Sequence, residues 1–359
     1  MSTITLFAVL CAGSWQPSEG LTWQNYELWK DRLALTAVER AYQTLPWEPG
    51  PKAAFEMARA TNKPLLIWIA DGDPLGATST YGVRARVELW RDRGVASGFI
   101  LLAMDLADLR LSSAGEEVAA QLPSGAKEGV LILDPMGKRL GFTPTLDPLA
   151  LQSVLDEART KPRAPSRPST QLWPEPSAPK GLRLRVLVKD VQKPKTGTFW
   201  HERAYNLGWL VVPDAELDRI KSLIRGREGQ SFSMSLRQRW ASRDFLDRVR
   251  GKAQPFEENS VQKSDLSAKC TAENRYQFQG KFTSSESGAW SLDGANDVQE
   301  RTRGMDITLL GQAVWDPKSS RWTKFEWVAV GTRWGGSPFN QRMKDEGVSE
   351  IGFLATLAE

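Results

Sequence analysis

Cysteine and histidine are almost missing from this chain of 359 residues, which holds Cys11, Cys270 and His201 and no others of either type. Zinc sites with four Cys or His ligands, iron–sulfur clusters and disulfide frameworks need more of these residues. We therefore expect no metal and no cofactor. The composition is otherwise that of a globular protein, with 41% hydrophobic and 25% charged residues, and the length fits two domains.

The chain also lacks an apolar run long enough to cross a membrane. The run at its start covers only residues 4–12, and small residues follow at 12–14. This pattern is typical of a secretory leader, so we expect residues 1–16 to be a signal peptide and the protein to be exported to the periplasm, the cell envelope or the medium. The alternative is that residues 4–12 form a first buried strand.

Strong charge of one sign is missing as well. The formal net charge is +4, with an acidic first half and a basic second half. Nucleic-acid-binding proteins normally present a concentrated basic face, and phosphate-binding glycine motifs do not occur in the sequence. We expect neither a nucleic acid nor a nucleotide as partner. The Arg-rich segment 237–252 is interpreted as a solvated face.

Helical patterning comes first along the chain. Residues 17–46 are predicted to be a helical extension, with one helix over 21–44. Its apolar positions recur at spacings of three, four and seven, and are Leu28, Leu35, Val38 and Tyr42. From 47 to 158, helical stretches alternate with apolar runs at 65–70, 99–104 and 129–133. Such runs are typical of strands buried on both faces, so this region is predicted to be an α/β domain.

The second half of the chain has a different period. Six prolines within 159–180 predict an extended linker. Beyond it, apolar residues alternate at every second position over long stretches, which predicts a mainly antiparallel β domain over 181–359, a sandwich or an open barrel. One or two helices are expected in this domain, one of them at 213–224.

The order of elements over 47–158 resembles that of thioredoxin-like domains. The segments that carry the resemblance are 62–67, Asp105 at a strand end, and the hairpin at 133–138. The resemblance implies a central mixed sheet with flanking helices. It also implies a redox dithiol after the first central strand and a cis proline just before the third.

Both working parts of such a redox site are missing here. Asp73 and Gly76 stand where the two cysteines would be, and Glu128 with Gly129 takes the place of the proline. Dithiol chemistry needs two thiols at the start of a helix, whose N-terminus lowers the pKa of the leading thiol. We therefore do not expect thiol–disulfide oxidoreductase activity.

A more specific resemblance is to exported two-domain proteins of planctomycete-type bacteria. In the first half it covers residues 73–79 and 90–92, with Ala77 where the compared members have a cysteine. In the second half it rests on residues 245–251, 322–331 and 351–358. This resemblance implies export and architecture but no activity.

Polar side chains gather in the loop that replaces the redox motif and in the helix that follows. The candidate binding residues are Asp71, Asp73, Thr78, Tyr81 and Arg84. One interpretation is a pocket for a small ligand or a peptide. The other is that the carboxylates and hydroxyls cap the helix, whose N-terminus carries free N–H groups.

The second domain offers His201, Trp322 and Trp334 as further candidates. Trp327 shares the strand face of Phe325 and is expected in the core, whereas Trp322 is predicted on the opposite face. Exposed indoles can stack on sugar rings or anchor a protein partner, although tryptophan is often half-exposed for structural reasons alone. His201 has no nucleophile motif near it, so a structural role is the alternative to catalysis.

The leading hypothesis is therefore an exported, non-redox thioredoxin-like protein that acts as a binding or assembly scaffold. Its partner would be another protein or an envelope polysaccharide. The competing hypothesis is a carbohydrate-binding or hydrolytic protein whose site lies in the β-rich domain. A pocket that holds two of His201, Trp322 and Trp334 would favour the second hypothesis.

Overall fold

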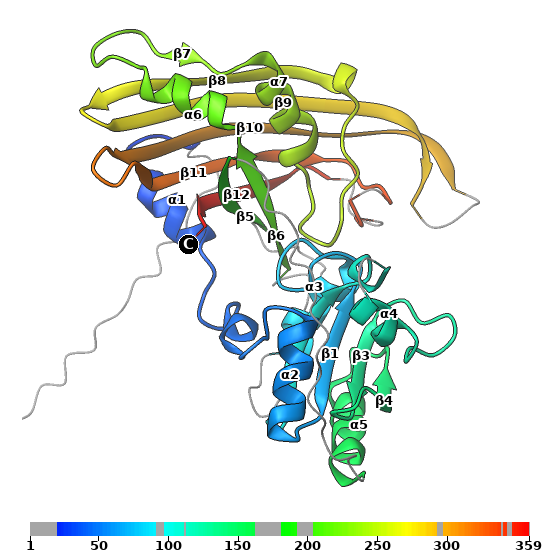
Figure 1. The fold of residues 1–359 in the computed structure, drawn as a ribbon. Helices are drawn as coiled ribbons and strands as arrows, with labels where there is room; N and C mark the ends of the chain where they lie inside the picture. The colour runs from blue at the N-terminus through cyan, green and yellow to red at the C-terminus, as the bar shows by residue number, and fades with distance from the viewer. Residues whose placement is uncertain are drawn as a thin grey trace, which may run out of the picture.

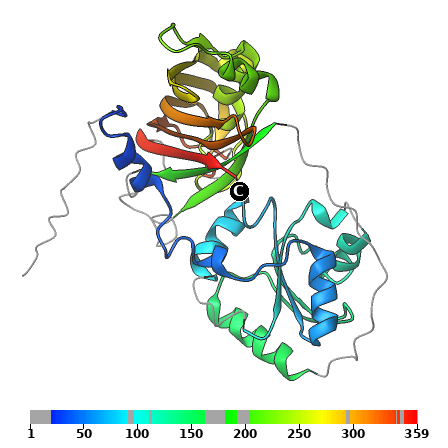
Figure 2. The same ribbon diagram turned by 60° about the vertical axis from the view of Figure 1, so that its left-hand side comes forward.

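A computed structural model describes residues 20–90, 97–110, 113–161, 181–191, 204–292, 297–338, 340–342 and 347–358 of the chain. The predicted signal peptide and almost all of the predicted linker lie outside these ranges. Within them the chain forms two separate sheets, shown in two orientations in Figures 1 and 2. We call residues 47–161 the α/β unit, residues 181–358 the β unit, and residues 20–46 the N-terminal segment.

The α/β unit is built on four strands in the order β2-β1-β3-β4. Strand β1 pairs parallel with β2 and antiparallel with β3, and β3 pairs antiparallel with β4. Every residue of β1 and β3 is buried, as their uninterrupted apolar sequences predict. The elements are α2 (Pro51–Thr61), β1 (Leu65–Ala70), α3 (Thr80–Glu88), β2 (Ile100–Asp105), α4 (Ser113–Ala119), β3 (Gly129–Leu133), β4 (Arg139–Thr143) and α5 (Pro148–Thr160).

The β unit is one antiparallel sheet of eight strands, in the order β6-β5-β12-β11-β10-β9-β8-β7. Its first strand β5 pairs with its last strand β12. Strands β8 to β12 follow one another along the chain, and each pairs with the next as an antiparallel meander. The elements are β5 (Leu182–Asp190), β6 (Tyr205–Val212), α6 (Asp214–Lys221), β7 (Gln230–Ser231), α7 (Met234–Arg239), β8 (Val261–Ala272), β9 (Arg275–Ser291), β10 (Val298–Asp316), β11 (Arg321–Trp334) and β12 (Ser349–Leu357).

The prediction of a mixed α/β sheet followed by a mainly antiparallel β unit is confirmed in this form. The β unit is a single sheet rather than a sandwich, because α6, α7 and the five-residue π-helix Trp240–Asp244 cover one face where a second sheet would lie (Figure 1). Leu217 and Ile220 of α6 face this core as predicted. Ile224 was expected there too, but it lies beyond the end of α6 and is exposed.

The N-terminal segment differs from its prediction. It forms only a short helix, α1 (Tyr26–Leu33), and a 3₁₀ turn at Ala41–Thr44, in place of one helix over 21–44. The buried face of α1 consists of Tyr26, Trp29 and Leu33, whereas Leu28 is 57% exposed and Val38 59%. Tyr42 of the predicted set is buried, but in the 3₁₀ turn; within α1, the apolar set with the larger side chains is the buried one.

A capping box accounts for the break after α1. The backbone N–H of Thr36 donates to the Glu39 carboxylate at 2.7 Å, and the N–H of Glu39 donates to the Thr36 hydroxyl at 3.3 Å. This reciprocal Thr-x-x-Glu pattern marks the start of a new turn. The chain therefore leaves α1 at Ala34, whose backbone is extended, and begins again at Thr36.

Ion pairs and hydrogen bonds fix the N-terminal segment to the outer face of the β unit, the face opposite α6 and α7. Lys30 of α1 pairs with Glu326 of β11 at 2.9 Å, and Lys189 of β5 pairs with Glu39 at 2.8 Å. The Tyr205 hydroxyl donates to the backbone carbonyl of Glu39 at 2.5 Å. Since both carboxylates are largely buried, these pairs hold the segment more firmly than exposed pairs would.

Acid should weaken this attachment. Burial alone would raise the pKa of Glu326, but hydrogen bonds from Lys30, Gln312 and Lys324 outweigh it, so the pKa lies below its ordinary value. A carboxylate whose pKa is lower in the folded than in the unfolded chain stabilises the fold at neutral pH, and this contribution is lost as the pH falls through the folded pKa.

We expect the urea-unfolding midpoint of the wild-type protein to drop between about pH 5 and 3, and that of Glu326→Gln to drop less. The exposed control Glu257→Gln should behave like wild type, and equal drops in all three proteins would contradict the assignment.

Candidate functional site

The candidate loop of the α/β unit connects the end of β1 to the start of α3. Its two limbs meet in an isolated β-bridge between Gly72 and Thr78. Gly72 adopts a φ of 93°, and its N–H donates to the Asp105 carboxylate at 2.9 Å, which ties the loop to the end of β2. Ser79 caps α3 by accepting from the N–H of Gly82 at 3.3 Å. Capping is thus one role of the hydroxyls here.

The positions where a thioredoxin-like domain would hold its redox parts brace the loop instead. The Asp73 carboxylate accepts from the N–H of Leu75 at 2.9 Å and lies against Gly76, where an added Cβ would come within 2.1 Å of it. Glu128 accepts from the N–H of Asp71 at 2.9 Å and from the Ser79 hydroxyl, so it joins both ends of the loop. No cis peptide bond occurs in the part of the chain that the structure describes.

The loop docks onto the β unit through Thr78 and Asn206 of β6. The N–H of Thr78 donates to the Asn206 side-chain oxygen at 3.3 Å, and the Asn206 amide donates back to the Thr78 carbonyl at 2.9 Å. The same amide also donates to the carbonyls of Arg248 and Gly251, at 3.0 and 3.2 Å. Thr78 and Asn206 are 0% and 1% exposed, so this edge of the α/β unit lies inside the molecule.

Arg86 of α3 fills the space behind the loop and is 3% exposed. Its guanidinium donates to the carbonyls of Pro74, at 2.9 Å, and of Gly76, and to the side-chain oxygen of Asn206 at 3.3 Å. Its Cζ atom also lies 5.3 Å from the ring centre of Tyr42 in the N-terminal segment. A single buried cation therefore joins the loop, the β unit and the N-terminal segment.

Gly251 sets how closely the two units approach. Its φ is 149°, and an added Cβ would lie 2.7 Å from the Thr80 hydroxyl oxygen. We expect Gly251→Ala to lower the free energy of unfolding by about 2 kcal/mol or more, because it adds a clash at the interface to backbone strain. Gly226, with a φ of 82° and open space around it, is the matched control. Gly226→Ala should cost about 1 kcal/mol from strain alone, and equal losses in urea unfolding would contradict a tight interface at Gly251.

The rim of this interface is solvated. Asp71 pairs with Lys252 of the β unit at 2.6 Å, and each of these side chains is about half exposed. Of the predicted loop residues, Asp71, Asp73 and Thr78 thus belong to the contact between the units or to the loop's own bracing. They do not converge on an open pocket.

The other two predicted residues of the α/β unit, Tyr81 and Arg84, line a groove on the outer side of α3. The groove has a volume of about 710 Å³, and its remaining walls are Glu88 and residues 144–148. Arg84 pairs with Glu88 at 3.2 Å. Burial, and in second place the charge of Glu128, raise the pKa of Tyr81. Among the described residues, the buried Tyr81 hydroxyl has no hydrogen-bond partner.

The two tryptophan candidates of the β unit are not brought together. Trp322 is 6% exposed and lies in the core, with its ring centre 5.5 Å from that of Phe325, so its predicted outward direction is wrong. The reason is a β-bulge: Val314 pairs with Lys324 and Trp315 with Trp322, which leaves Thr323 unpaired and turns Trp322 to the other face. Trp327 is buried in the core as predicted.

Trp334 and His201 complete the set of predicted residues. Trp334 stands opposite Gly304, where an added Cβ would touch the indole at 2.2 Å, so the ring lies across the β10 backbone. Trp322 and Trp334 are twelve residues apart on β11, or about 40 Å along the strand, and cannot line one small pocket. His201 lies outside the described residues. Within those residues, no three Asp, Glu, His or Cys side chains are grouped as metal ligands would be.

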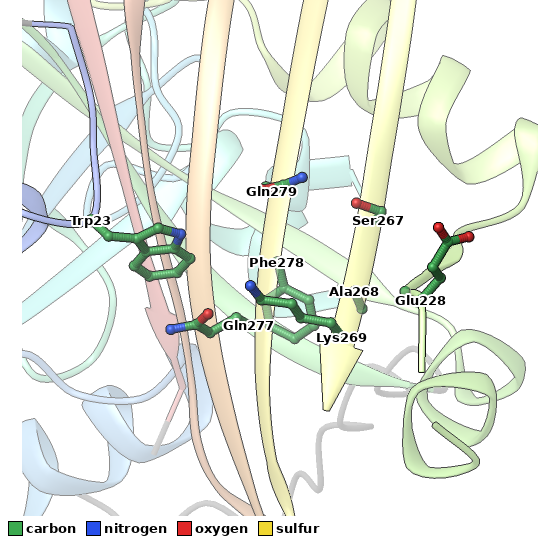
Figure 3. A pocket seen from close by; sticks show the side chains of 9 residues that line it. Trp23, Glu228, Ser267, Ala268, Lys269, Gln277, Phe278 and Gln279 are labelled. Atoms are coloured by element: carbon green, nitrogen blue, oxygen red, sulfur yellow. The ribbon is translucent and has the colours of Figure 1, made fainter. Parts of the chain in front are cut away.

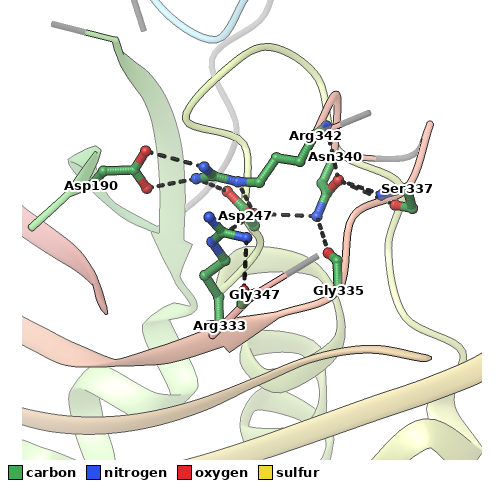
Figure 4. Close-up of polar contacts among 8 residues, drawn as sticks. All are labelled: Asp190, Asp247, Arg333, Gly335, Ser337, Asn340, Arg342 and Gly347. Carbon is green, nitrogen blue, oxygen red and sulfur yellow. Dashed lines mark hydrogen bonds and ion pairs between the residues drawn. The ribbon is translucent and has the colours of Figure 1, made fainter. Parts of the chain in front are cut away.

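A buried ionic network, which the sequence analysis missed, holds the end of β5 against the loop before β12 (Figure 4). Arg342, fully buried, makes two hydrogen bonds to Asp247, at 2.5 and 2.9 Å, and two to Asp190, at 2.6 and 3.1 Å. Asn340 donates to Asp247 at 3.2 Å, and Arg333 lies 3.8 Å from the same carboxylate. Burial alone would lower the pKa of Arg342, but the two carboxylates raise it.

The Arg-rich segment 237–252 is only in part the solvated face that was expected: Arg243 is exposed and Lys252 is about half exposed. Arg250, by contrast, is 6% exposed, and Arg239, whose side chain is 39% exposed, pairs with Asp244 at 3.3 Å. These side chains hold the loops around α7 together. Among the helices that the structure describes, none has both the length and the apolar character of a membrane span.

The two sheets and the loop after β1 define the class of this protein by its architecture alone. A mixed four-stranded α/β unit docks, through the edge that carries this loop, on an eight-stranded antiparallel sheet. No protein-family model matches this chain, and no curated protein matches it significantly. The function must therefore be argued from the geometry of the chain itself.

Proposed function

We propose that the chain is an exported, non-redox thioredoxin-like protein that acts as a binding or assembly scaffold. Three features support the thioredoxin-like assignment: the strand order β2-β1-β3-β4, the parallel β1–β2 pair joined through α3, and the closing β3–β4 hairpin followed by α5. Export rests on the leader-like residues 1–16 of the sequence.

The observation that carries the proposal is the buried contact between Thr78, Arg86 and Asn206. In a redox protein of this architecture, the loop after β1 must be open to a substrate disulfide, because a thiolate has to reach the sulfur that it attacks. Here the corresponding loop is covered by the β unit, and its key positions are Asp73 and Gly76 in place of cysteines. This arrangement supports a structural role for the loop after β1, in which the loop holds the two units together.

A partner would then bind on the outer side of α3. The groove there has the volume of a ligand site and combines an aromatic side chain, Tyr81, with the charged pair Arg84 and Glu88. Prolines at both ends of its loop wall, Pro144 and Pro148, restrict that wall in the free protein. These features fit an extended segment of another protein better than a polysaccharide.

The test is a comparison of binding to two classes of partner. We expect the immobilised protein to enrich peptides from a random displayed library, and Arg84→Glu to abolish their binding. Arg225→Glu, a change at an exposed site of the β unit, should leave it intact. Retention of envelope polysaccharides instead, or peptide binding that ignores Arg84→Glu, would contradict the proposal. So would insulin reduction faster than that of Cys270→Ser.

The alternative function, a carbohydrate-binding or hydrolytic site around His201, Trp322 and Trp334, has less support. It needs at least two of these side chains in one pocket. The burial of Trp322 and its separation from Trp334 along β11 favour the scaffold instead.

A further inference from the structure

We infer that a cleft on the outer face of β8 and β9 binds one ring of a neutral sugar. This goes beyond the proposed scaffold function, since the cleft is formed by other residues than the groove beside α3. It has a volume of about 260 Å³ and lies between the N-terminal segment and the edge of the β unit (Figure 3). Its polar lining residues are Glu228, Ser267, Lys269, Gln277 and Gln279, and its aromatic wall is Trp23.

The floor of the cleft follows from the pairing of two strands. Ser267 pairs with Gln279, and Lys269 pairs with Gln277. Because side chains alternate along a strand, these four lie on one face, while the intervening Ala268 is buried in the core on the other. Directly paired residues are about 5 Å apart, and alternate residues along a strand about 7 Å. The four polar residues thus stand at the corners of a rectangle of about 5 by 7 Å, comparable with the spread of the hydroxyl groups around a single pyranose ring.

The aromatic wall of the cleft is the indole of Trp23. Figure 3 shows Trp23 beside Gln277, with Glu228 at the opposite end of the cleft. Trp23 is half-buried, and its ring lies at a tilt against Tyr26, with 5.5 Å between the centres. A pyranose presents C–H groups on one face, and these pack on an aromatic ring while the hydroxyls point outward to polar side chains.

Within the part of the chain that the structure describes, three polar side chains of the cleft have hydrogen-bonding groups that no other protein group occupies. Among the described residues, the side chains of Ser267, Gln277 and Gln279 make no hydrogen bond. Farther along the same face, polar side chains do pair with each other: Thr283 donates to Asp306 at 3.1 Å, and Ser287 and Thr302 are 2.8 Å apart. A glutamine amide offers two donors and one acceptor oxygen, which suits adjacent hydroxyl groups.

The charge of the cleft favours a neutral ligand. Lys269 and Glu228 contribute one charge of each sign, so neither a phosphate nor a polycation is selected. A larger cavity of about 810 Å³, at the end of β10 and β11, is less suited to a sugar. There the ammonium of Lys221 lies 4.6 Å from the ring centre of Trp315 and covers its face.

The test uses saturation-transfer NMR on the full chain with four probes: the methyl glycosides of glucose, galactose, mannose and N-acetylglucosamine. We expect a signal from at least one probe, and an affinity at least tenfold weaker in Gln277→Ala and in Trp23→Ala. Trp23→Phe should retain part of the affinity because it keeps an aromatic face. Gln262→Ala, an exposed change on the neighbouring strand β8 outside the cleft, should have no effect.

Two outcomes would overturn the inference. One is the absence of a signal from all four probes, and the other is a signal that Gln277→Ala leaves unchanged. Gln277 lies on the sheet surface, so its truncation leaves the fold intact, which unchanged urea midpoints would verify. Tighter binding of glucuronate than of methyl glucoside would contradict the assignment to a neutral sugar.

Discussion

Replacing Arg342 by methionine should destabilise the protein by about 3–5 kcal/mol, the usual cost of removing one partner from a buried ion pair. The variant leaves the carboxylates of Asp190 and Asp247 buried without the cation that donates four hydrogen bonds to them. Urea unfolding of the full chain measures the loss. A similar stability of wild type and Arg342→Met would show that the network contributes little.

A control variant sharpens this prediction. Asp265→Ala removes an exposed carboxylate whose nearest ion-pair partner is Lys263 at 3.4 Å, so it should cost less than about 1 kcal/mol. Equal losses in Arg342→Met and Asp265→Ala would contradict this explanation.

Replacing Arg86 by leucine should cost about 2–3 kcal/mol and loosen the contact between the two units. The change removes hydrogen bonds to the carbonyls of Pro74 and Gly76 and to the side chain of Asn206, all of them buried. Buried acceptors left without a donor each carry a desolvation cost. Unfolding in urea gives the energy, and broadening into two transitions would report the loss of coupling between the units.

Arg84 provides a matched control on the same helix. It lies two residues before Arg86, its side chain is 39% exposed, and it pairs with Glu88 at the surface. Arg84→Leu should change the free energy of unfolding by less than about 1 kcal/mol. Equal effects of the two leucine variants would mean that Arg86 does not join the units.

The strands of the α/β unit could be predicted from sequence because their burial is decided locally. The apolar run at 65–70 coincides with β1, and that at 129–133 with β3. The helix of the N-terminal segment could not, because two apolar sets had the same period and the choice between them depends on the outer face of the β unit. The Thr36–Glu39 capping box was a signal in the sequence that would have ended the helix earlier.

The candidate site was predicted only in part. Sequence located the loop after β1, because its limits depend on neighbouring residues. It did not predict the partner of the loop, since Thr78 and Asn206 are 128 residues apart in the chain. Nor did it predict that Arg86 is buried while Arg84 is not. Both are arginines of one short helix, and only the packing of the β unit buries Arg86. The direction of Trp322 depended on one unpaired residue in β11.

The central claim is that the β unit closes the loop edge of the α/β unit. A zero-length carbodiimide, which joins a carboxylate to an amine already in contact, tests it through Asp71 and Lys252, whose charged atoms are 2.6 Å apart at the solvated rim. We predict that mass spectrometry of the monomer recovers a peptide cross-linked between these residues and that Lys252→Gln eliminates it. The pair Lys281 and Asp306, 3.7 Å apart within the β unit, is the internal control. Recovery of the control cross-link without the Asp71–Lys252 cross-link would contradict the account.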